Sequence, residues 1–284
     1  MLFRSCLLMA GSVSHLRCMA ADLQEALSRV GLRVTFAESF WCSSHAVCEP
    51  LKSRLVVNNI VVPYVCAQTG QFKHLGATLS LDGRCQISLQ ARLECGWRAF
   101  FTRSDVWRSK APLADKLQVL HQVVQPCVLY GSESWSLTSA QRRSLDAALH
   151  SMVRRIMGLR RRPTDQGLEP WLDWWRRTAR AARQAWTRGG YLPWSSCQRQ
   201  QKWRWAGVLA CAPSPARLIT LWRGVEWTRE QFRSEGSRRV KRDKPGKPVR
   251  WENSLHAFWE ARGLSWSSAD LWAELEDHFV ARVL

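Results

Sequence analysis

The acidic residues of this sequence are too scattered to form an evident catalytic centre. Enzymes that transfer nucleotides by a two-metal mechanism hold two divalent ions on clustered carboxylates, yet no two aspartates are adjacent in the 284 residues. The densest acidic group consists of Asp270, Glu274, Glu276 and Asp277, which a helix would place about one turn apart. We interpret this group as the exposed face of a helix rather than as a nuclease metal site.

Three potential metal ligands, Cys42, His45 and Cys48, are separated by two residues each. A structural zinc site needs a fourth ligand, so we favour scattered buried thiols and expect neither a resident metal nor another cofactor. The ten cysteines are spread along the chain, unlike those of a small secreted disulfide scaffold. This pattern favours an intracellular protein, in the nucleus or the cytoplasm, that is not secreted.

Positive charge is the strongest compositional signal. The chain has 42 Lys and Arg against 23 Asp and Glu, which gives a formal net charge of +19, and only nine of these basic residues lie within residues 1–96. A surplus of this size indicates an anionic partner. Because Arg both binds phosphate and stacks on bases, its excess favours nucleic acid over an anionic membrane. We therefore expect a nucleic-acid partner, and neither a membrane nor a small-molecule substrate.

The first part of the chain predicts one helix and a small sheet. Residues 20–32 have helical apolar spacing that ends at Gly31, and residues 34–40 are expected to be extended. Residues 55–65 are rich in β-branched side chains around an Asn-Asn turn, and residues 72–80 form another extended piece before the turn at Asp82 and Gly83. We expect these pieces to form a small antiparallel sheet. The first 21 residues contain two Arg and no acid, as a targeting peptide does, but we favour a truncated piece of a longer protein.

Apolar spacing becomes helical from Ile87 onward. One helix is expected from there to about Phe100, and a second over residues 113–124, where Pro126 is expected to interrupt it. A third helix begins at Thr138 or Ser139, both good caps, and ends at Gly158. Its predicted core face carries Leu145, Leu149, Met152, Val153 and Ile156.

The remaining residues combine tryptophan with arginine. Residues 163–166 are expected to be a linker, after which Trp171, Trp174 and Trp175 share one helical face among many Arg. We favour a hydrophobic core or helix-packing seam for these tryptophans over direct stacking on bases. Further helices are expected over residues 195–211 and from Trp251, and between them residues 233–250 form a flexible basic segment that suits phosphate contact or a nuclear-import signal.

Several short blocks occur in the order seen in the reverse transcriptases of non-LTR retrotransposons. The block Val-Leu-Tyr-Gly-Ser-Glu-Ser-Trp over residues 128–135 resembles the thumb of that family, and Phe-Lys-His-Leu-Gly over residues 72–76 resembles its primer grip. Further similar blocks lie at residues 22–27, 31–32, 107–110, 154–158, 204–207 and 248–252. The chain thus resembles the C-terminal part of such an enzyme, comprising the end of the palm, the thumb and the C-terminal extension.

The resemblance implies an α+β, mainly helical fold, with a small palm-derived antiparallel sheet, a thumb helical bundle and a helical basic C-terminal extension. It implies five parts: a truncated palm remnant with a primer-grip-like segment at residues 1–86, a thumb-like helical region at 87–162, a Trp/Arg-rich helical extension at 163–232, the basic flexible segment at 233–250, and C-terminal helices at 251–284.

The family's paired catalytic aspartates have no counterpart here. In the family they lie on the strand before the block that resembles residues 22–27, whereas residues 11–21 contain no acid. We therefore predict a catalytically inactive fragment, whose intact ancestor was an RNA-directed DNA polymerase that used a divalent metal. A decayed pseudogene product without specific activity and an incomplete gene model of a polymerase are the alternatives.

The predicted function is sequence-independent binding of RNA, an RNA/DNA hybrid or a DNA duplex through phosphate contacts. No catalytic residue is predicted. The predicted contacts come from the primer-grip-like turn, the exit of the thumb helix and the basic segment: Lys73, His74, Leu75, Gly76, Arg154, Arg155, Arg160, Arg161, Arg162, Arg238, Arg239, Lys241, Arg242, Lys244 and Lys247.

Overall fold

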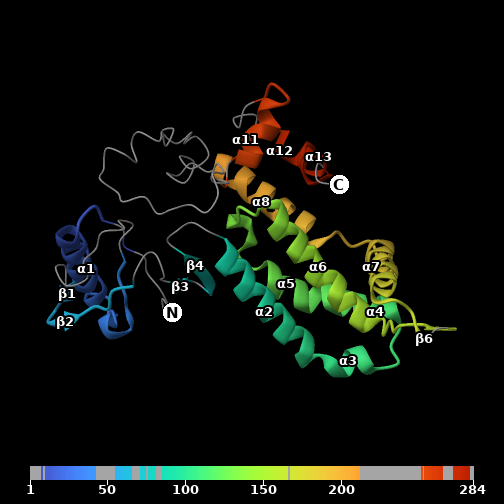
Figure 1. Cartoon of the computed structure of the whole chain (residues 1–284). Helices are drawn as coiled ribbons and strands as arrows, with labels where there is room; N and C mark the ends of the chain where they lie inside the picture. Colours follow the sequence, from blue (N-terminus) through green and yellow to red (C-terminus); the bar gives the residue numbers. More distant parts are fainter. Residues whose placement is uncertain are drawn as a thin grey trace, which may run out of the picture. The chain divides into compact units, whose positions relative to one another are not determined.

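The described residues form two compact units. The computed structural model describes residues 8, 10–42, 55–65, 71–74, 76–80, 85–165, 167–211, 251, 253–264 and 271–281 (Figure 1). Among these residues, the first unit ends at Ile87 and the second begins at Ser88. No helix in the described ranges is long and apolar enough to cross a membrane.

The first unit is built on helix α1 (Val13–Ser28), which packs against hairpin β1 (Val56–Val57) and β2 (Ile60–Val61). The helix starts seven residues earlier than the apolar spacing predicted, because the Ser12 side chain accepts a hydrogen bond from the His15 N–H and caps it. The predicted extended segment over 34–40 is wrong in its centre, which forms a 3₁₀ turn, η1 (Phe36–Glu38). The core of this unit contains Ala20, Phe36, Trp41, Leu55, Val57 and Val62.

The strands form separate antiparallel hairpins and no continuous sheet within the described residues. Asn58 and Asn59 connect β1 to β2 with φ of 50° and 64°, the left-handed conformation that a tight hairpin turn needs, so the predicted Asn-Asn turn is confirmed. The predicted extended piece over 72–80 is in fact a hairpin of β3 (Gln71–His74) and β4 (Ala77–Ser80). The chain reverses at Gly76, whose φ is 80°, because glycine adopts this backbone conformation without a steric cost. The Asp82-Gly83 turn lies outside the described residues.

The second unit begins within the first turn of α2 (Gln86–Thr102), and the short α3 (Ser104–Arg108) follows. Leu89 and Phe100 on α2 are buried. The Trp107 indole, also buried, donates a hydrogen bond of 2.6 Å to the Phe100 carbonyl, which fixes α3 against the end of α2.

Pro126 does not interrupt the next helix, so that prediction is wrong. The chain stays helical from α4 (Leu113–Val119) through a π segment, η2 (Leu120–Val124), into α5 (Gln125–Leu129). Pro126 stands in the first turn of α5. A proline ring clashes with the preceding helical turn and offers no N–H, and the wider π turn lets the chain continue past it.

Helix α6 (Ser139–Ile156) follows the sequence prediction closely. Thr138 caps it in a reciprocal pair with Gln141, and Gly158 has a φ of 60° just after its end. All five residues predicted for its core face are buried: Leu145, Leu149, Met152, Val153 and Ile156.

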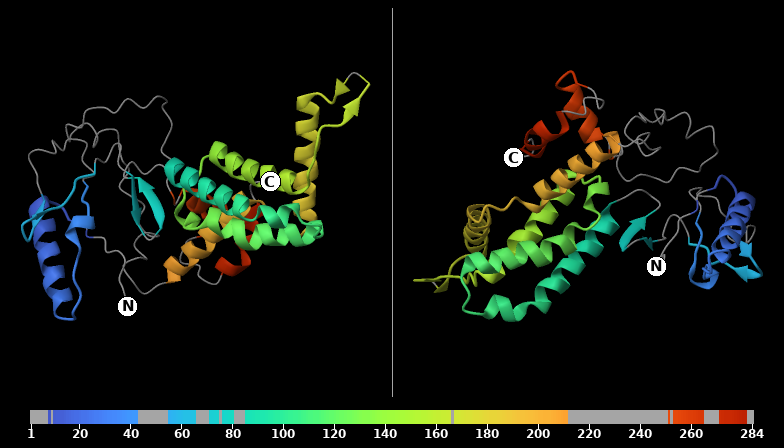
Figure 2. Two further views of the ribbon diagram at one scale, coloured as in Figure 1. Left: turned by 90° about the horizontal axis from the view of Figure 1, so that it is seen from below. Right: turned by 180° about the vertical axis from the view of Figure 1, so that it is seen from behind.

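Two further helices pack on α6, namely α7 (Trp171–Arg188) and α8 (Trp194–Cys211). Asp146 of α6 caps the start of α8, since its carboxylate accepts hydrogen bonds from both the N–H and the hydroxyl of Ser195, at 2.9 and 2.6 Å. The predicted linker at 163–166 is partly wrong, because β5 (Pro163–Thr164) and β6 (Gly167–Leu168) form an exposed hairpin there. In Figure 2 this hairpin and the first turns of α7 project from the other helices of the unit.

The C-terminal helices α11 (Asn253–Glu260), α12 (Leu271–Glu274) and α13 (Glu276–Ala281) bury an aromatic cluster with α8. The cluster contains Trp203, Ala206, Leu255, Phe258, Trp259, Trp272 and Phe279. The predicted exposed acidic face is wrong for Glu276, because Arg204 of α8 binds its carboxylate at 2.7 Å and its side chain is only 18% exposed. Asp270 lies outside the described residues.

Candidate nucleic-acid interface

The end of α6 carries two arginines against aromatic rings. The Arg154 guanidinium lies 5.9 Å from the Trp174 ring, and that of Arg155 lies 5.3 Å from the Trp97 ring. Burial, together with the adjacent Arg155, lowers the pKa of Arg154 from its usual value. No carboxylate within the described ranges forms an ion pair with either residue. The rings therefore orient these cations without neutralising them.

The segment after α6, residues 159–162, is fastened along the start of α7. The Trp174 indole donates to the Leu159 carbonyl at 3.3 Å, and Arg177 donates to the Arg160 carbonyl at 3.1 Å. The Arg161 guanidinium donates to the Glu169 carbonyl, at 2.7 Å from its Nε. We call residues 154–162 the α6 exit. These hydrogen bonds hold the part of it after the helix, residues 159–162, against α7.

The Glu169 carboxylate is bound by Arg177 and by the Arg162 N–H, so it is not available to pair with other cations. Its carboxylate accepts hydrogen bonds of 2.6 and 2.9 Å from Arg177 and a third from the Arg162 N–H. The Arg177 hydrogen bonds, with help from Arg162, lower the pKa of Glu169 from 4.5 to about 2. Arg177 and Glu169 thus neutralise each other.

The three arginines predicted at residues 160–162 have different environments. All three are exposed, but the donors of Arg161 are directed to the Glu169 carbonyl. The side chains of Arg160 and Arg162 have no hydrogen bond or ion pair among the described residues. These two can contact a phosphate without breaking a contact of the fold.

Helix α7 exposes two tryptophans that were predicted to lie in a core or helix-packing seam. Trp171 and Trp175 are 60% and 42% exposed, so the favoured interpretation as core residues is wrong for these two. Trp174 is half-buried and does contribute to helix packing. Arg176 and Arg180 are exposed on the same helix, and the only acid near Arg176 among the described residues is Asp173, at 3.9 Å.

The primer-grip-like turn lies in the first unit. Lys73 is exposed on β3 and pairs with Thr78 of β4, and Gly76 provides the turn between the strands. The side chains of His74 and Leu75 lie outside the described set. The turn and the α6 exit belong to different units, so they are two separate groups of predicted contacts.

The other predicted sites are only partly visible. The basic residues Arg238, Arg239, Lys241, Arg242, Lys244 and Lys247 lie outside the described residues, as do His45 and Cys48. Burial raises the pKa of the remaining potential zinc ligand, the Cys42 thiol, which disfavours the thiolate that zinc binds. In the described part of the chain, no group of three His, Cys, Asp or Glu could hold a metal ion.

Two potential nucleophiles, Ser195 and Cys197, lie in the first turn of α8. The Ser195 hydroxyl donates a hydrogen bond to the Asp146 carboxylate, which also accepts from the Ser195 N–H and so caps α8. Burial raises the pKa of the Cys197 thiol to about 11, which keeps it protonated and unreactive at neutral pH.

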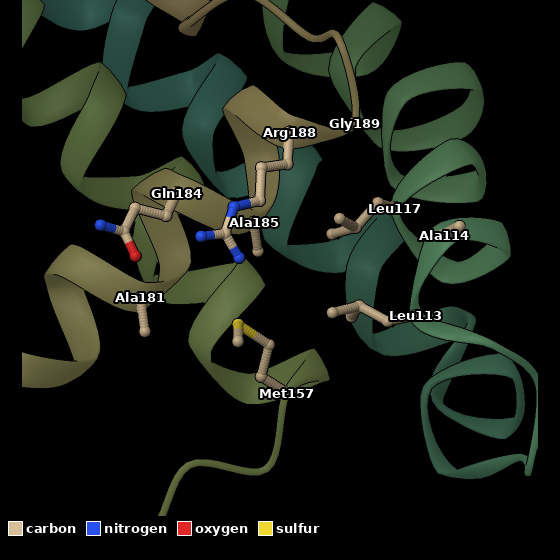
Figure 3. Close-up of a pocket in the computed structure, with 9 residues that line it drawn as sticks. All are labelled: Leu113, Ala114, Leu117, Met157, Ala181, Gln184, Ala185, Arg188 and Gly189. Atoms are coloured by element: carbon tan, nitrogen blue, oxygen red, sulfur yellow. The ribbon is translucent and has the colours of Figure 1, made fainter.

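An apolar hollow lies between α4, the end of α6 and α7 (Figure 3). Its volume is about 390 Å³, and it is lined by Leu113, Ala114, Leu117, Met157, Ala181, Gln184, Ala185, Arg188 and Gly189. Arg188 is the single charged group of this lining, and its side chain extends over the hollow toward Met157 (Figure 3). The lining contains no nucleophile and no acid or base pair, so it offers no catalytic arrangement.

Comparison of the chain with known protein families, with curated proteins and with solved structures finds no match. The resemblance to non-LTR retrotransposon reverse transcriptases therefore remains a prediction from the short blocks of sequence. What the structure adds is the mainly helical fold and the geometry of the basic and aromatic side chains.

Proposed function

We propose that this protein binds RNA or an RNA/DNA duplex through its phosphates, without sequence preference, and that the α6 exit is the centre of the binding surface. We further propose that it performs no polymerase step, because it lacks the adjacent aspartates on which that step depends. The family resemblance supports this proposal, since the corresponding thumb helix follows the backbones of template and primer.

The observation that carries the proposal is the charge pattern at the α6 exit. Arg155, Arg160 and Arg162 are exposed, whereas Glu169, which is bonded to the backbone of this segment, is paired with Arg177. A polyanion approaching this surface therefore meets exposed cations on a backbone that α7 holds in place. Binding by such cations releases counterions from the nucleic acid, so affinity should fall steeply with salt.

The proposal is tested by reversing two charges at the exit and two elsewhere. The double variant Arg160→Glu/Arg162→Glu leaves Arg161 and its bond to Glu169 in place. Its matched control, Arg142→Glu/Arg143→Glu, changes the net charge equally at the other end of α6, about 20 Å away at 1.5 Å per residue. Fluorescence anisotropy with a labelled RNA/DNA duplex measures the affinity of each full-length variant.

We expect the exit variant to bind the duplex at least about tenfold more weakly than the control variant. Circular dichroism of both variants establishes that α6 and α7 remain folded. Equal losses in the two variants would contradict the proposal, because the net charge of +19 would then act without a defined site. That outcome is the one expected of a decayed product with no specific activity.

The milder variant Arg160→Ala/Arg162→Ala tests the same surface through its salt dependence. With a DNA duplex as the probe, the slope of log affinity against log salt should become shallower by about 1.8 if both side chains contact phosphates, at about 0.9 per contact. An unchanged slope would show that neither side chain contacts a phosphate.

A further inference from the structure

Trp171 and Trp175 continue the packed face of α7 beyond the helices that cover it. Thr178, Ala182 and Trp186 are buried on this face, and the 3.6-residue period places Trp171 and Trp175 above them on the same side. The two tryptophans nevertheless remain 60% and 42% exposed. Figure 2 shows the reason, since the first turns of α7 project from the rest of the unit with hairpin β5–β6.

This projecting end is held firmly at its base. On the same helix, the Trp174 indole donates to the Leu159 carbonyl at 3.3 Å, and the Arg154 guanidinium lies 5.9 Å from the Trp174 ring. One turn further on, Arg177 binds the Glu169 carboxylate at 2.6 Å. Two large rings four residues apart are thus neighbours on a fixed helix, so little conformational entropy is lost when a flat ligand covers them.

The charges at the base of α7 select the occupant. Arg160 and Arg162 are exposed on the segment whose backbone is bonded to Arg177 and Glu169, and Glu169 is itself paired with Arg177. A ligand for this surface must offer flat apolar faces and a repeated negative charge. Unpaired nucleotides offer both, because each base has a π face and each link carries a phosphate.

We infer that Trp171 and Trp175 form a stacking platform for the bases of single-stranded nucleic acid, whose phosphates contact Arg160 and Arg162. This inference rests on the proposed function and specifies its substrate: a strand whose unpaired end continues past the duplex held at the α6 exit. A paired duplex conceals its base faces and gains nothing from the platform.

The test uses two double variants of the full chain. Trp171→Ala/Trp175→Ala removes the rings, whereas Leu168→Ala/Leu172→Ala removes neighbouring apolar side chains that are 60% and 48% exposed but cannot stack on bases. Anisotropy is measured with a labelled 12-nucleotide oligouridylate, with an abasic oligomer of the same length and charge, and with a blunt RNA/DNA duplex.

We expect the tryptophan variant to bind oligouridylate about fivefold or more weakly, with unchanged affinity for the abasic oligomer and the duplex. The leucine variant should match the original protein on all three ligands. The conservative variant Trp171→Tyr/Trp175→Tyr should recover most of the affinity, since tyrosine also stacks.

Three outcomes would overturn the inference. Equal binding of oligouridylate by the tryptophan variant and the original protein would show that bases do not use these rings, and the proposed function would survive if the Arg160 and Arg162 variant still lost affinity. Equal loss on the abasic oligomer would indicate a general defect rather than stacking. If sedimentation instead shows a dimer that both double variants dissociate, the surface is an interface between copies of the chain. Absence of binding to every oligomer by the original protein would contradict the proposed function itself.

Discussion

Glu169 is the residue on which the geometry of the candidate interface depends. Its carboxylate joins Arg177 of α7 to the N–H of Arg162, while its carbonyl accepts from Arg161. These bonds tie a basic segment to the helix that carries the exposed tryptophans. The charged hydrogen bonds also make this junction sensitive to acid.

The acid sensitivity gives a prediction for the variant Glu169→Gln. The pKa of Glu169 falls from 4.5 to about 2 in the folded protein, so its charged form stabilises the fold fully above about pH 4.5. That stabilisation is lost as the pH falls toward 2. Thermal denaturation at pH 6 and at pH 3 should therefore show a smaller difference in midpoint for the variant than for the original protein.

The other acids titrate in both the variant and the original protein. Comparing the pH 6 to pH 3 difference in midpoint between the two proteins therefore isolates the contribution of Glu169. The variant should also be less stable at pH 6, where it lacks the ion pair with Arg177. An identical pH dependence in the two chains would show that the Glu169 contacts do not contribute to folding stability.

The sequence located the basic side chains of the site but could not assign their roles. The run of three arginines at residues 160–162 is evident from the sequence alone. Which of its members contact protein depends on Glu169, which the β5–β6 hairpin brings back beside them. No sequence signal predicted that hairpin, because its strands are two residues long and carry no alternating apolar pattern.

At the scale of elements, helix α6 was the most predictable part of the chain. Its cap at Thr138, its glycine stop and its five buried apolar residues were all evident in the sequence. Helix α7 was harder, because periodicity identifies the face that carries Trp171 and Trp175 but not how far the neighbouring helices extend over it. The π segment before Pro126 had no sequence signal, since the wider turn depends on the packing of α4 and α5.

The contact between α2 and α5 gives a prediction about helix packing. A Cβ added to Gly96 would overlap the Cγ2 atom of Val128, which is completely buried. In an uncrowded helix, Gly→Ala stabilises by up to about 1 kcal/mol. Here we expect Gly96→Ala to destabilise the protein by about 1–3 kcal/mol, because the added methyl group must displace Val128.

Urea denaturation measures this effect, and a second substitution identifies its cause. If the clash with Val128 is responsible, Gly96→Ala/Val128→Ala should lose less stability than the sum of the two single variants. Additive losses, or a stabilising Gly96→Ala, would contradict the close approach of α2 and α5.

At the scale of the molecule, most of the described tryptophans have structural roles. Trp186, Trp194, Trp203, Trp259 and Trp272 are buried in the second unit, and the C-terminal helices are held on α8 by the rings of three of them. Buried cations contribute as well, since Arg199 of α8 donates to the Phe279 carbonyl and Lys202 donates to the Ser254 hydroxyl. Trp171 and Trp175 differ from these five tryptophans because their rings are largely exposed.

The mainly helical character was predictable from the apolar spacing after Ile87, whereas the arrangement of the first unit was not. There the structure has a helix and separate two-stranded hairpins, where we had expected pieces of one sheet. Short strands with few apolar residues do not specify which partner they pair with. The palm and thumb correspondence accordingly remains a prediction from the sequence blocks.

The central claim is that the positive charge is organised into a nucleic-acid site. The most direct test is a competition experiment, in which the intact protein bound to a labelled RNA/DNA duplex is challenged with unlabelled duplex or with heparin over a series of salt concentrations. Heparin presents a high charge density without the geometry of a nucleic acid. We predict that the unlabelled duplex competes more effectively than heparin at equal concentration of anionic groups. Equal competition, or stronger competition by heparin, would contradict the account, because charge alone would then explain all of the binding.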